Sequence, residues 1–277
     1  ISVSAAEKSY SALPKEEETP VLNERFEEGE DIPSSAPENS SRTDYGVDDS
    51  GEPHPHIAWS DRYKEARSFL YGSDDVEPDF EQALSMFLEE AETGNALAMH
   101  NLGRMYADGL GAEIDRDVSF AWYKKALSAF MDIEAEKENK YVDYRIGKMY
   151  AAGLGTEQDY EAAAEWFDMA VSRNYKYAQY SLAGLYYRGQ GVVQSFENAF
   201  ELYRRSARQR VPYASYELAK MYREGVGTAK NVEEAEIHFE EAFLGFQKLE
   251  EQSHDDKLQY RLGYMLYTGT GTEKDVE

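Results

Sequence analysis

The chain has 277 residues, and its 54 acidic and 29 basic side chains give a formal net charge of −25. This acidic charge balance argues against general affinity for nucleic acids, because such binding depends on clustered Lys and Arg side chains that displace counterions from the phosphates. It also argues against binding to an anionic membrane surface. The absence of cysteine excludes disulfides and thiolate metal sites. No apolar run approaches the ~18 residues that span a bilayer, and the N-terminus lacks a secretory signal pattern, so we expect a cytoplasmic protein.

Residues 1–57 differ in composition from the rest of the chain. They hold six of the eight prolines, several acidic and serine-containing runs, and few apolar groups. Such a segment cannot bury enough apolar surface to offset the entropy of ordering, so we predict an acidic, Pro/Ser-rich linker or disordered arm. His54 and His56 lie within it without a third ligand nearby, and we predict no metal site there. Because the chain opens on Ile1, we expect it to be part of a longer polypeptide.

One ten-residue sequence motif occurs five times after residue 94. Its copies are LGRMYADGLG (102–111), IGKMYAAGLG (146–155), LAGLYYRGQG (182–191), LAKMYREGVG (218–227) and LGYMLYTGTG (262–271). The second glycines follow one another at intervals of 44, 36, 36 and 44 residues. A period in the mid-thirties is typical of a solenoid of helical hairpins. We therefore predict an all-α, right-handed solenoid of about five antiparallel helical hairpins plus a truncated sixth.

The residues before each glycine pair are predicted to form the first helix of a hairpin. A small residue recurs there, at Gly103, Gly147, Ala183, Ala219 and Gly263. An aromatic column lies three residues earlier, at His100, Tyr144, Tyr180, Tyr216 and Tyr260. A second lies three residues later, at Tyr106, Tyr150, Tyr186, Tyr222 and Leu266. At ~100° per residue these columns share one broad face, where the small residue lets a neighbouring helix approach closely.

The glycine pair should end this first helix, because it allows backbone angles that other residues avoid. Four residues after the second glycine stands a preferred N-cap, at Asp115, Asp159, Ser195, Asn231 and Asp275, with Asp79 in register upstream. Each such cap stabilises the start of a second helix by ~1 kcal/mol. That helix carries its own aromatic column at Phe87, Tyr123, Phe167, Tyr203 and Phe239. The same spacing in every unit indicates interlocking helices rather than an aromatic cofactor site.

No catalytic, cofactor or metal site is predicted. His100 and His238 occupy packing columns, so we expect them in or beside the core. The Gly-x-Gly pairs lack the Walker lysine and follow a helix rather than a strand, which excludes a phosphate loop. No nucleophile, base and orienting group converge in the sequence, and we predict that the chain is not an enzyme.

These motifs resemble Sel-one-like repeats, which are relatives of tetratricopeptide repeats. The match covers about residues 95–277, through A-x-Y-x-LG-x-MY-x-x-G-x-G followed by D-x-x-x-A-x-x-W-[YF]-x-x-A. The resemblance implies units near 95–139, 140–174, 175–210 and 211–255, with a half unit at 256–277. Residues 58–94 are expected to form a degenerate N-terminal capping repeat, with Ser73, Asp74 and Asp75 standing where the glycine turn belongs.

The two 44-residue units each add eight residues after the second helix, which we expect to lengthen that helix and its loop. The 44-36-36-44 pattern, together with residues 254–275, resembles the repeat region downstream of the catalytic domain in some mobilisation-type relaxases of bacterial conjugative elements. That similarity concerns an accessory region only. Nothing in this chain resembles the catalytic tyrosine and histidine cluster of a relaxase.

Binding is expected on the concave surface of the solenoid, which the first helices should line. A stripe of residues opposite the packed face, with two tyrosines at its edge, is basic within an acidic chain: Asn101, Arg104, Arg145, Lys148, Arg188, Lys220, Arg261, Tyr264, Tyr187 and Tyr267. These cations either balance the acidic second helices or form a groove for an acidic or C-terminal peptide, in which Arg binds carboxylates and Tyr packs on apolar side chains.

The sequence therefore predicts a non-catalytic protein-protein interaction scaffold. The alternative is an accessory module of a conjugative relaxase. We expect a protein or peptide partner, no direct nucleic-acid or membrane binding, and self-association through the last hairpin if the apolar face of Leu262, Met265 and Leu266 is open.

Overall fold

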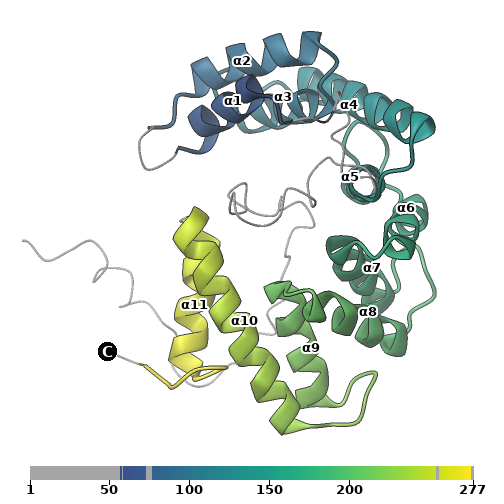
Figure 1. Ribbon diagram of the computed structural model, residues 1–277, viewed down its shortest axis with the longest axis vertical. Helices are drawn as coiled ribbons and strands as arrows, with labels where there is room; N and C mark the ends of the chain where they lie inside the picture. The colour runs from purple at the N-terminus through teal and green to yellow at the C-terminus, as the bar shows by residue number, and fades with distance from the viewer. Residues whose placement is uncertain (1–56, 58, 73–76, 254–255, 276–277) are drawn as a thin grey trace, which may run out of the picture. The chain divides into compact units, whose positions relative to one another are not determined.

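The computed structural model describes residues 57, 59–72, 77–253 and 256–275, and this part of the chain folds into eleven α-helices without a strand (Figure 1). The helices are α1 (Asp61–Tyr71), α2 (Phe80–Glu92), α3 (Ala96–Asp108), α4 (Arg116–Glu136), α5 (Lys140–Ala152), α6 (Tyr160–Ser172), α7 (Lys176–Arg188), α8 (Phe196–Arg208), α9 (Pro212–Glu224), α10 (Val232–Ser253) and α11 (Asp256–Thr268). The predicted all-α class is confirmed. The linker or arm predicted over residues 1–57 lies, except for Ile57, outside the described residues.

The second helices begin at the N-cap residues that the sequence predicts. Asp79, Asp115, Asp159, Ser195 and Asn231 each accept a hydrogen bond from a backbone N–H in the first turn of α2, α4, α6, α8 or α10, at distances of 3.0 to 3.2 Å. These bonds satisfy N–H groups that a helix start leaves without an internal partner. The helix expected after Asp275 lies outside the described residues.

A backbone hydrogen bond closes the turn that follows each first helix. The N–H of the N-cap residue donates to the carbonyl of an aromatic or leucine residue near the end of the first helix, at 2.8 to 3.0 Å, and the acceptors are Phe69, Tyr106, Tyr150, Tyr186, Tyr222 and Leu266. The first glycine of each pair makes this reversal possible. At Gly153, for example, φ is +67°, a left-handed conformation that costs other residues energy.

The first hairpin, α1 with α2, departs in part from the expected turn. Ser73, Asp74 and Asp75 were expected in place of a glycine turn, but α1 ends at Gly72, which has a φ of +76°. Its ψ of 171° differs from the left-handed helical value of the other turns. Residues 73–76 lie outside the described part of the chain, so the rest of this turn is untested. Gly72 therefore supplies the helix end that the sequence analysis missed.

The core forms where an aromatic ring of the second helix lies on the small residue of the first. A Cβ added to Gly103 would lie 2.7 Å from the ring of Tyr123, and one added to Gly147 would lie 2.6 Å from the ring of Phe167. Both rings belong to the predicted aromatic column and are buried. The packing predicted from the column spacing is therefore confirmed in these two hairpins.

First helices of successive hairpins also contact one another. The rings of Tyr144 in α5 and Tyr177 in α7 lie 6.2 Å apart, and those of Tyr180 in α7 and Tyr213 in α9 lie 6.1 Å apart. The second pair stands 36 residues after the first in both members. The same contact thus recurs one unit later, and α5, α7 and α9 pack in a common register.

The second glycine of each pair sets where a hairpin meets the preceding second helix. A Cβ at Gly191 would lie 2.1 Å from the carbonyl group of Tyr160, and one at Gly227 would lie 2.2 Å from that of Phe196; these are the first residues of α6 and α8. At Gly155 the nearest atom would be the backbone nitrogen of Lys124, well inside α4. The 44-residue units therefore shift this contact along the second helix.

The shift follows from helix length. The second helices α4 and α10 have 21 and 22 residues, whereas α6 and α8 have 13 each, which confirms that the extra residues lengthen the helix. Eight residues correspond to about 12 Å of helix at 1.5 Å per residue. The hairpin that follows a long second helix is displaced along it by about that distance. Such displacements occur before α5 and after α9, so α5, α7 and α9 form a group of first helices that share one register.

Candidate functional site

At the N-terminal end of the predicted stripe, not every residue is exposed as expected. Asn101 is buried, and its side-chain amide donates to the hydroxyl of Tyr63 in α1 at 3.0 Å. Asn101 was expected on an open binding surface, and that expectation is wrong because α1 packs over this part of α3. Asn101 instead joins the first helices of two neighbouring hairpins.

Arg104 is also engaged by its own surroundings. Its Nη1 donates to the Tyr71 hydroxyl at 2.9 Å, and its Nε donates to Asp108 at 3.3 Å. The side chain remains about one third exposed. Arg104 therefore keeps a partly accessible charge that a partner would share with Asp108.

Besides Arg104, whose guanidinium is 5.5 Å from the ring centre of Tyr71, two further arginines of the stripe lie on aromatic rings. The guanidinium of Arg145 in α5 is 5.7 Å from the ring centre of Phe130, and that of Arg261 in α11 is 5.1 Å from Tyr216 and 5.2 Å from Phe246. A planar guanidinium held on a ring keeps its edge donors in a defined orientation. Both side chains are half-buried.

Arg188 reaches the centre of the stripe because α7 has a glycine there. Its terminal nitrogens would lie 3.0 and 3.2 Å from a Cβ added to Gly184, so the guanidinium lies back along α7 over that residue. Gly184 occupies the same position in its helix as Lys148 in α5 and Lys220 in α9. We name Lys148, Arg188 and Lys220 the central row. Each belongs to one of the three in-register first helices.

The other members of the stripe differ in exposure. Lys220 is half-buried and pairs with Glu217 of its own helix at 3.1 Å. Tyr264 and Tyr267 in α11 are exposed, at 42% and 41%, while Tyr187 is half-buried with its ring 5.2 Å from that of Phe196. Of the predicted stripe, Asn101 is thus buried, whereas the residues from α5 to α11 are half-buried or exposed.

Buried phenols stand behind the stripe. Burial raises the pKa of Tyr180 and of Tyr203, with the charge of Glu217 adding to the effect, and burial also raises the pKa of Tyr187. These hydroxyls remain protonated at neutral pH, so they can donate hydrogen bonds but cannot act as bases. The sequence showed Tyr180 and Tyr203 only as packing residues, and only the fold places them beside Glu217.

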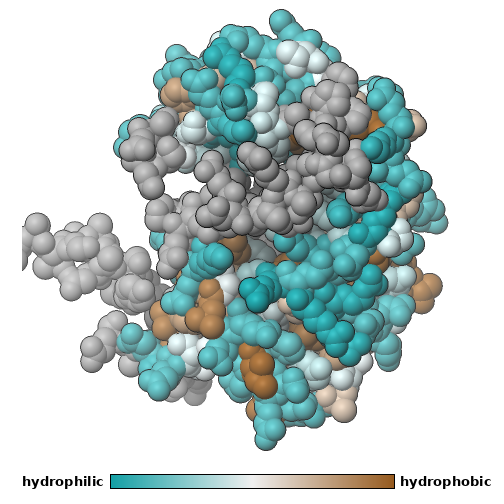
Figure 2. Space-filling model, in the orientation of Figure 1, coloured by the Kyte–Doolittle hydropathy of each residue, from teal (hydrophilic) through white to brown (hydrophobic). Residues whose placement is uncertain are grey.

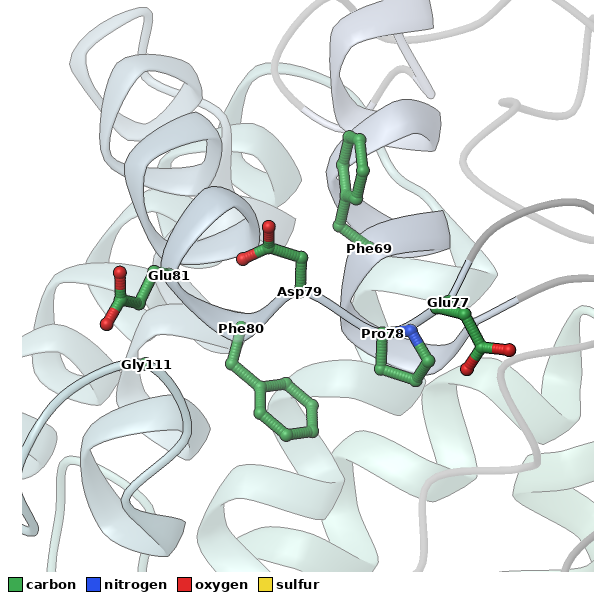
Figure 3. A pocket seen from close by; sticks show the side chains of 7 residues that line it. All are labelled: Phe69, Glu77, Pro78, Asp79, Phe80, Glu81 and Gly111. Carbon is green, nitrogen blue, oxygen red and sulfur yellow. The ribbon is translucent and has the colours of Figure 1, made fainter.

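A shallow pocket lies at the start of α2 (Figure 3). It is lined by Phe69, Glu77, Pro78, Asp79, Phe80, Glu81 and Gly111. The Asp79 carboxylate already caps α2, and Gly111 touches the backbone of Phe80. The pocket is therefore mainly the seam where the turn of the second hairpin meets α2.

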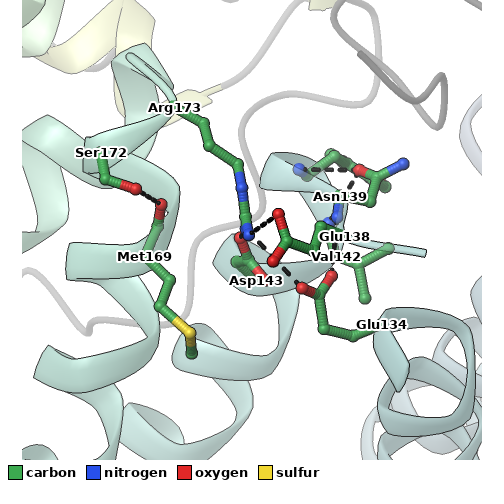
Figure 4. A network of polar contacts seen from close by, with 9 residues as sticks. Glu134, Glu138, Asn139, Val142, Asp143, Met169, Ser172 and Arg173 are labelled. Carbon is green, nitrogen blue, oxygen red and sulfur yellow. Dashed lines mark hydrogen bonds and ion pairs between the residues drawn. The ribbon is translucent and has the colours of Figure 1, made fainter. Parts of the chain in front are cut away.

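A buried charge cluster joins the end of α4 to α5 and α6 (Figure 4). Arg173, at the end of α6, bonds to the buried carboxylate of Asp143 and lies 2.8 Å from Glu138 and 3.6 Å from Glu134. Glu134 also accepts from the backbone N–H of Asn139 at 2.7 Å. Three carboxylates thus surround one guanidinium, and Asp143 Oδ1 has no hydrogen-bond partner among the described residues.

Family comparison identifies the repeats. The model of the Sel1 repeat matches residues 66–91, 96–129, 142–175, 176–211, 212–244 and 257–277, which together make up more than half of the chain. The chain belongs to the Sel1 repeat family. The first matched segment lies in the α1–α2 hairpin, so this hairpin is a Sel1 repeat with an altered turn.

One solved structure supports the same fold, and two others are also similar. A Sel1 repeat protein from Oxalobacter formigenes is 22% identical with a TM-score of 0.54, over 77% of this chain and 79% of that one. Two others are the protective antigen c5321 of uropathogenic Escherichia coli (23% identity, 77% of this chain and 50% of that one, TM-score 0.44) and the immunity protein Pa5087 of Pseudomonas aeruginosa (20%, 84% and 89%, TM-score 0.48). The aligned part thus spans half of the c5321 chain. No curated protein matches the sequence.

The two histidines of the Sel1 packing columns lie where packing residues were expected. His100 is buried with its ring 5.1 Å from that of Tyr123, and His238 stacks on Tyr222 at 5.7 Å while its Nδ1 lies 2.8 Å from Glu241. Within the described segments no group of His, Asp or Glu is arranged to hold a metal ion. No described helix is long and apolar enough to cross a membrane. His54 and His56 lie outside the described residues.

The last Sel1 hairpin differs from expectation in one residue. Met265 was expected on an open apolar face, but it is fully buried because it packs in a cluster with Phe243 and Phe246 of α10. Leu262 and Leu266 are half-buried, and the exposed rings of this helix are Tyr260, Tyr264 and Tyr267. Figure 2 shows a mainly hydrophilic face with separate hydrophobic patches, as is common for protein surfaces.

The Asp143 cluster should make the stability of this Sel1 solenoid pH-dependent. Burial and the charge of Glu134 raise the pKa of Asp143 to about 7 despite Arg173, whereas an unfolded aspartate titrates near 3.9. The folded state thus binds the extra proton between these values, and the resulting stability is lost as pH rises from about 4 through about 7. We expect the free energy of unfolding to fall by roughly 2–4 kcal/mol over this range relative to Asp143→Asn. Denaturant unfolding of both proteins at several pH values measures this difference, and parallel pH profiles would contradict it.

Proposed function

We propose that this Sel1-repeat chain is a non-catalytic protein-interaction scaffold that binds an acidic or C-terminal segment of a partner protein on the stripe of its first helices. Helical-hairpin repeat proteins present extended surfaces of this kind. One observation carries the proposal. Six cations gather on the stripe of a chain whose net charge is −25.

The side chains of the stripe suit a carboxylate-bearing peptide. Arg145 and Arg261 are held on aromatic rings, and a guanidinium binds a carboxylate through two parallel hydrogen bonds. The exposed rings of Tyr264 and Tyr267 offer apolar contact on the same helix as Arg261. The proposed peptide thus finds charge recognition along the stripe and apolar contact at α11.

Reversing two charges of the stripe tests this function. In Arg145→Glu with Lys148→Glu, the two new carboxylates would repel an acidic segment, so we expect partner capture from a lysate of the source organism to be abolished. Thermal melts of the variant and of the unaltered protein are compared alongside, because both side chains are half-buried at the surface of α5 and a loss of folding would also abolish capture.

The matched control reverses two cations on second helices. Lys124 in α4 and Lys248 in α10 are both exposed, so Lys124→Glu with Lys248→Glu changes the net charge equally. We expect this control to capture the partner normally. Equal capture by both double variants would mean that the stripe only balances the acidic second helices, and the binding proposal would be wrong.

The alternative proposal is an accessory module of a conjugative relaxase. Its support is the resemblance in unit lengths and in residues 254–275, and the long helices α4 and α10 belong to the two 44-residue units of that pattern. The test is the coding sequence upstream of Ile1 in the source genome. A metal-histidine nuclease domain there would favour the relaxase module, and an unrelated domain would exclude it.

A further inference from the structure

Just ahead of the described structure, the chain carries a segment with the chemistry proposed for the partner. Residues 44–52 read DYGVDDSGE and hold four carboxylates and no basic side chain: Asp44, Asp48, Asp49 and Glu52. Tyr45 and Val47 add an aromatic and an aliphatic side chain. The segment thus combines the negative charge and the apolar groups that the stripe is proposed to bind.

The chain enters the described structure beside the N-terminal end of the stripe. Ile57 is fully buried and belongs to the main core cluster. The ring of Trp59 lies 5.7 Å from that of Tyr63, whose hydroxyl accepts a hydrogen bond from Asn101 in α3. Trp59 and Tyr63 therefore anchor the chain next to Asn101, and residues 44–52 are tethered to that point.

The helix α5 offers two cations and no open carboxylate of its own. Arg145 and Lys148 stand about one helical turn apart and are half-buried. The single acidic residue of α5, Asp143, is buried and bonded to Arg173. On α3 and α9 a cation of the stripe instead pairs with a carboxylate of its own helix. The helix α7 also lacks an acidic residue, but it lies one hairpin further along the chain.

The distance from α3 to Arg145 follows from contacts along α4. The ring of His100 in α3 lies 5.1 Å from that of Tyr123 in α4. Phe130 follows Tyr123 by two helical turns, about 11 Å, and its ring lies 5.7 Å from the guanidinium of Arg145. Arg145 is therefore on the order of 20 Å from His100, the neighbour of Asn101.

The tether is long enough to cover this distance. Asp49 lies ten residues before Trp59, and Asp44 lies fifteen residues before it. An extended chain spans about 3.3–3.6 Å per residue, so the two carboxylates reach up to about 35 and 50 Å from the anchor. Residues 44–52 can therefore reach α5 of their own chain.

We propose that residues 44–52 bind to Arg145 and Lys148 of their own chain and compete there with the partner segment. The carboxylates of Asp48 and Asp49 pair with the two cations. Exposed ion pairs are individually weak, so a partner can displace the segment, while the short tether keeps its local concentration in the millimolar range. This inference rests on the proposed function, since it adds regulation to the same stripe.

A labelled peptide with the sequence of residues 44–52 tests the competition. Fluorescence anisotropy compares its affinity for the full chain and for a variant whose own segment is neutralised by Asp44→Asn, Asp48→Asn, Asp49→Asn and Glu52→Gln. We expect the neutralised variant to bind the peptide about tenfold more tightly, because a tethered competitor has been removed. Adding Arg145→Glu and Lys148→Glu to this variant should abolish binding, whereas adding Lys124→Glu and Lys248→Glu should not change it.

The matched control neutralises four other carboxylates that precede Ile57, through Glu16→Gln, Glu17→Gln, Glu18→Gln and Glu38→Gln. Its net charge changes equally, and it should bind the peptide as weakly as the unaltered chain. An equal gain in both neutralised variants, no gain in either, or no binding at all would overturn the proposal. If the competition fails but partner capture still depends on Arg145 and Lys148, the scaffold stands; if that capture also fails, both are wrong.

The absence of cysteine from the chain allows a second test that alters no residue of the stripe. A nitroxide attached at Val47→Cys should broaden the backbone amide signals of α5 in the full chain, and the four neutralising substitutions should remove this broadening. Broadening that disappears on dilution would mean that a second copy supplies the segment. That result, or unbroadened signals throughout α5, would overturn the proposal.

Discussion

Gly191→Ala is expected to destabilise the protein by about 4 kcal/mol or more, among the largest effects of any single substitution in the chain. The added Cβ would lie 2.1 Å from the carbonyl group of Tyr160, which is backbone and cannot move aside without displacing the start of α6. The left-handed φ of +65° adds about 1–2 kcal/mol for a residue with a side chain. Losses above about 4 kcal/mol are rare and indicate a specific steric cause. Urea unfolding followed by circular dichroism measures the loss.

Gly189→Ala provides the matched control two residues away. Gly189 has nearly the same φ, +68°, but its nearest neighbour would be the Cβ of Gln194 at 3.1 Å, a side-chain atom. We expect a loss of only about 1–2 kcal/mol, from backbone conformation alone. Equal losses in the two variants would show that φ, and not the contact between successive hairpins, makes the second glycine necessary.

Arg173→Gln is expected to cost about 3–5 kcal/mol at pH 8. The substitution leaves Asp143 buried beside Glu134 without a cation, and an unpaired buried charge is strongly destabilising. The loss should be smaller at pH 5, because protonation of Asp143 removes the uncompensated charge. Unfolding free energies at the two pH values test both statements. As a control, Lys64→Gln removes an exposed pair with Asp61 and should have little effect at either pH.

The next hairpin of the same chain suggests a rescue. Gln179 and Gln209 stand 36 residues after Asp143 and Arg173, and the Gln209 side-chain amide donates to the Gln179 carbonyl oxygen at 2.8 Å. Asp143→Gln combined with Arg173→Gln would place the same neutral pair in the charge cluster around Asp143. We expect the double variant to recover most of the loss of Arg173→Gln and to lose its pH dependence. If the double variant were as unstable as Arg173→Gln alone, the contact between these two hairpins would require charged side chains.

Local patterns in the sequence were sufficient to predict the hairpins. An N-cap such as Asp159, a glycine pair such as Gly153 and Gly155, and a small residue facing an aromatic column act within one unit, so their spacing shows directly which residues meet. The same reasoning missed the role of Gly72, because the expected second glycine is absent from that turn. It also placed Met265 on an open face, where α10 in fact covers it.

The candidate binding residues were predicted as a stripe, but only the tertiary structure decided which of them are presented together. Asn101 is lost to Tyr63 of the neighbouring hairpin, a contact between residues 38 positions apart that no periodicity reveals. Arg188 enters the central row because its long side chain lies back over Gly184, which depends on rotamer and space rather than on sequence position.

The sequence by itself therefore determined the fold family, the helix ends and the charge of the first helices, because these depend on residues within one repeat. The tertiary structure decided the register between repeats. Extra residues in α4 and α10 displace the neighbouring hairpins by about 12 Å and leave α5, α7 and α9 aligned. That register arises from contacts between different repeats, which no pattern within one repeat reveals.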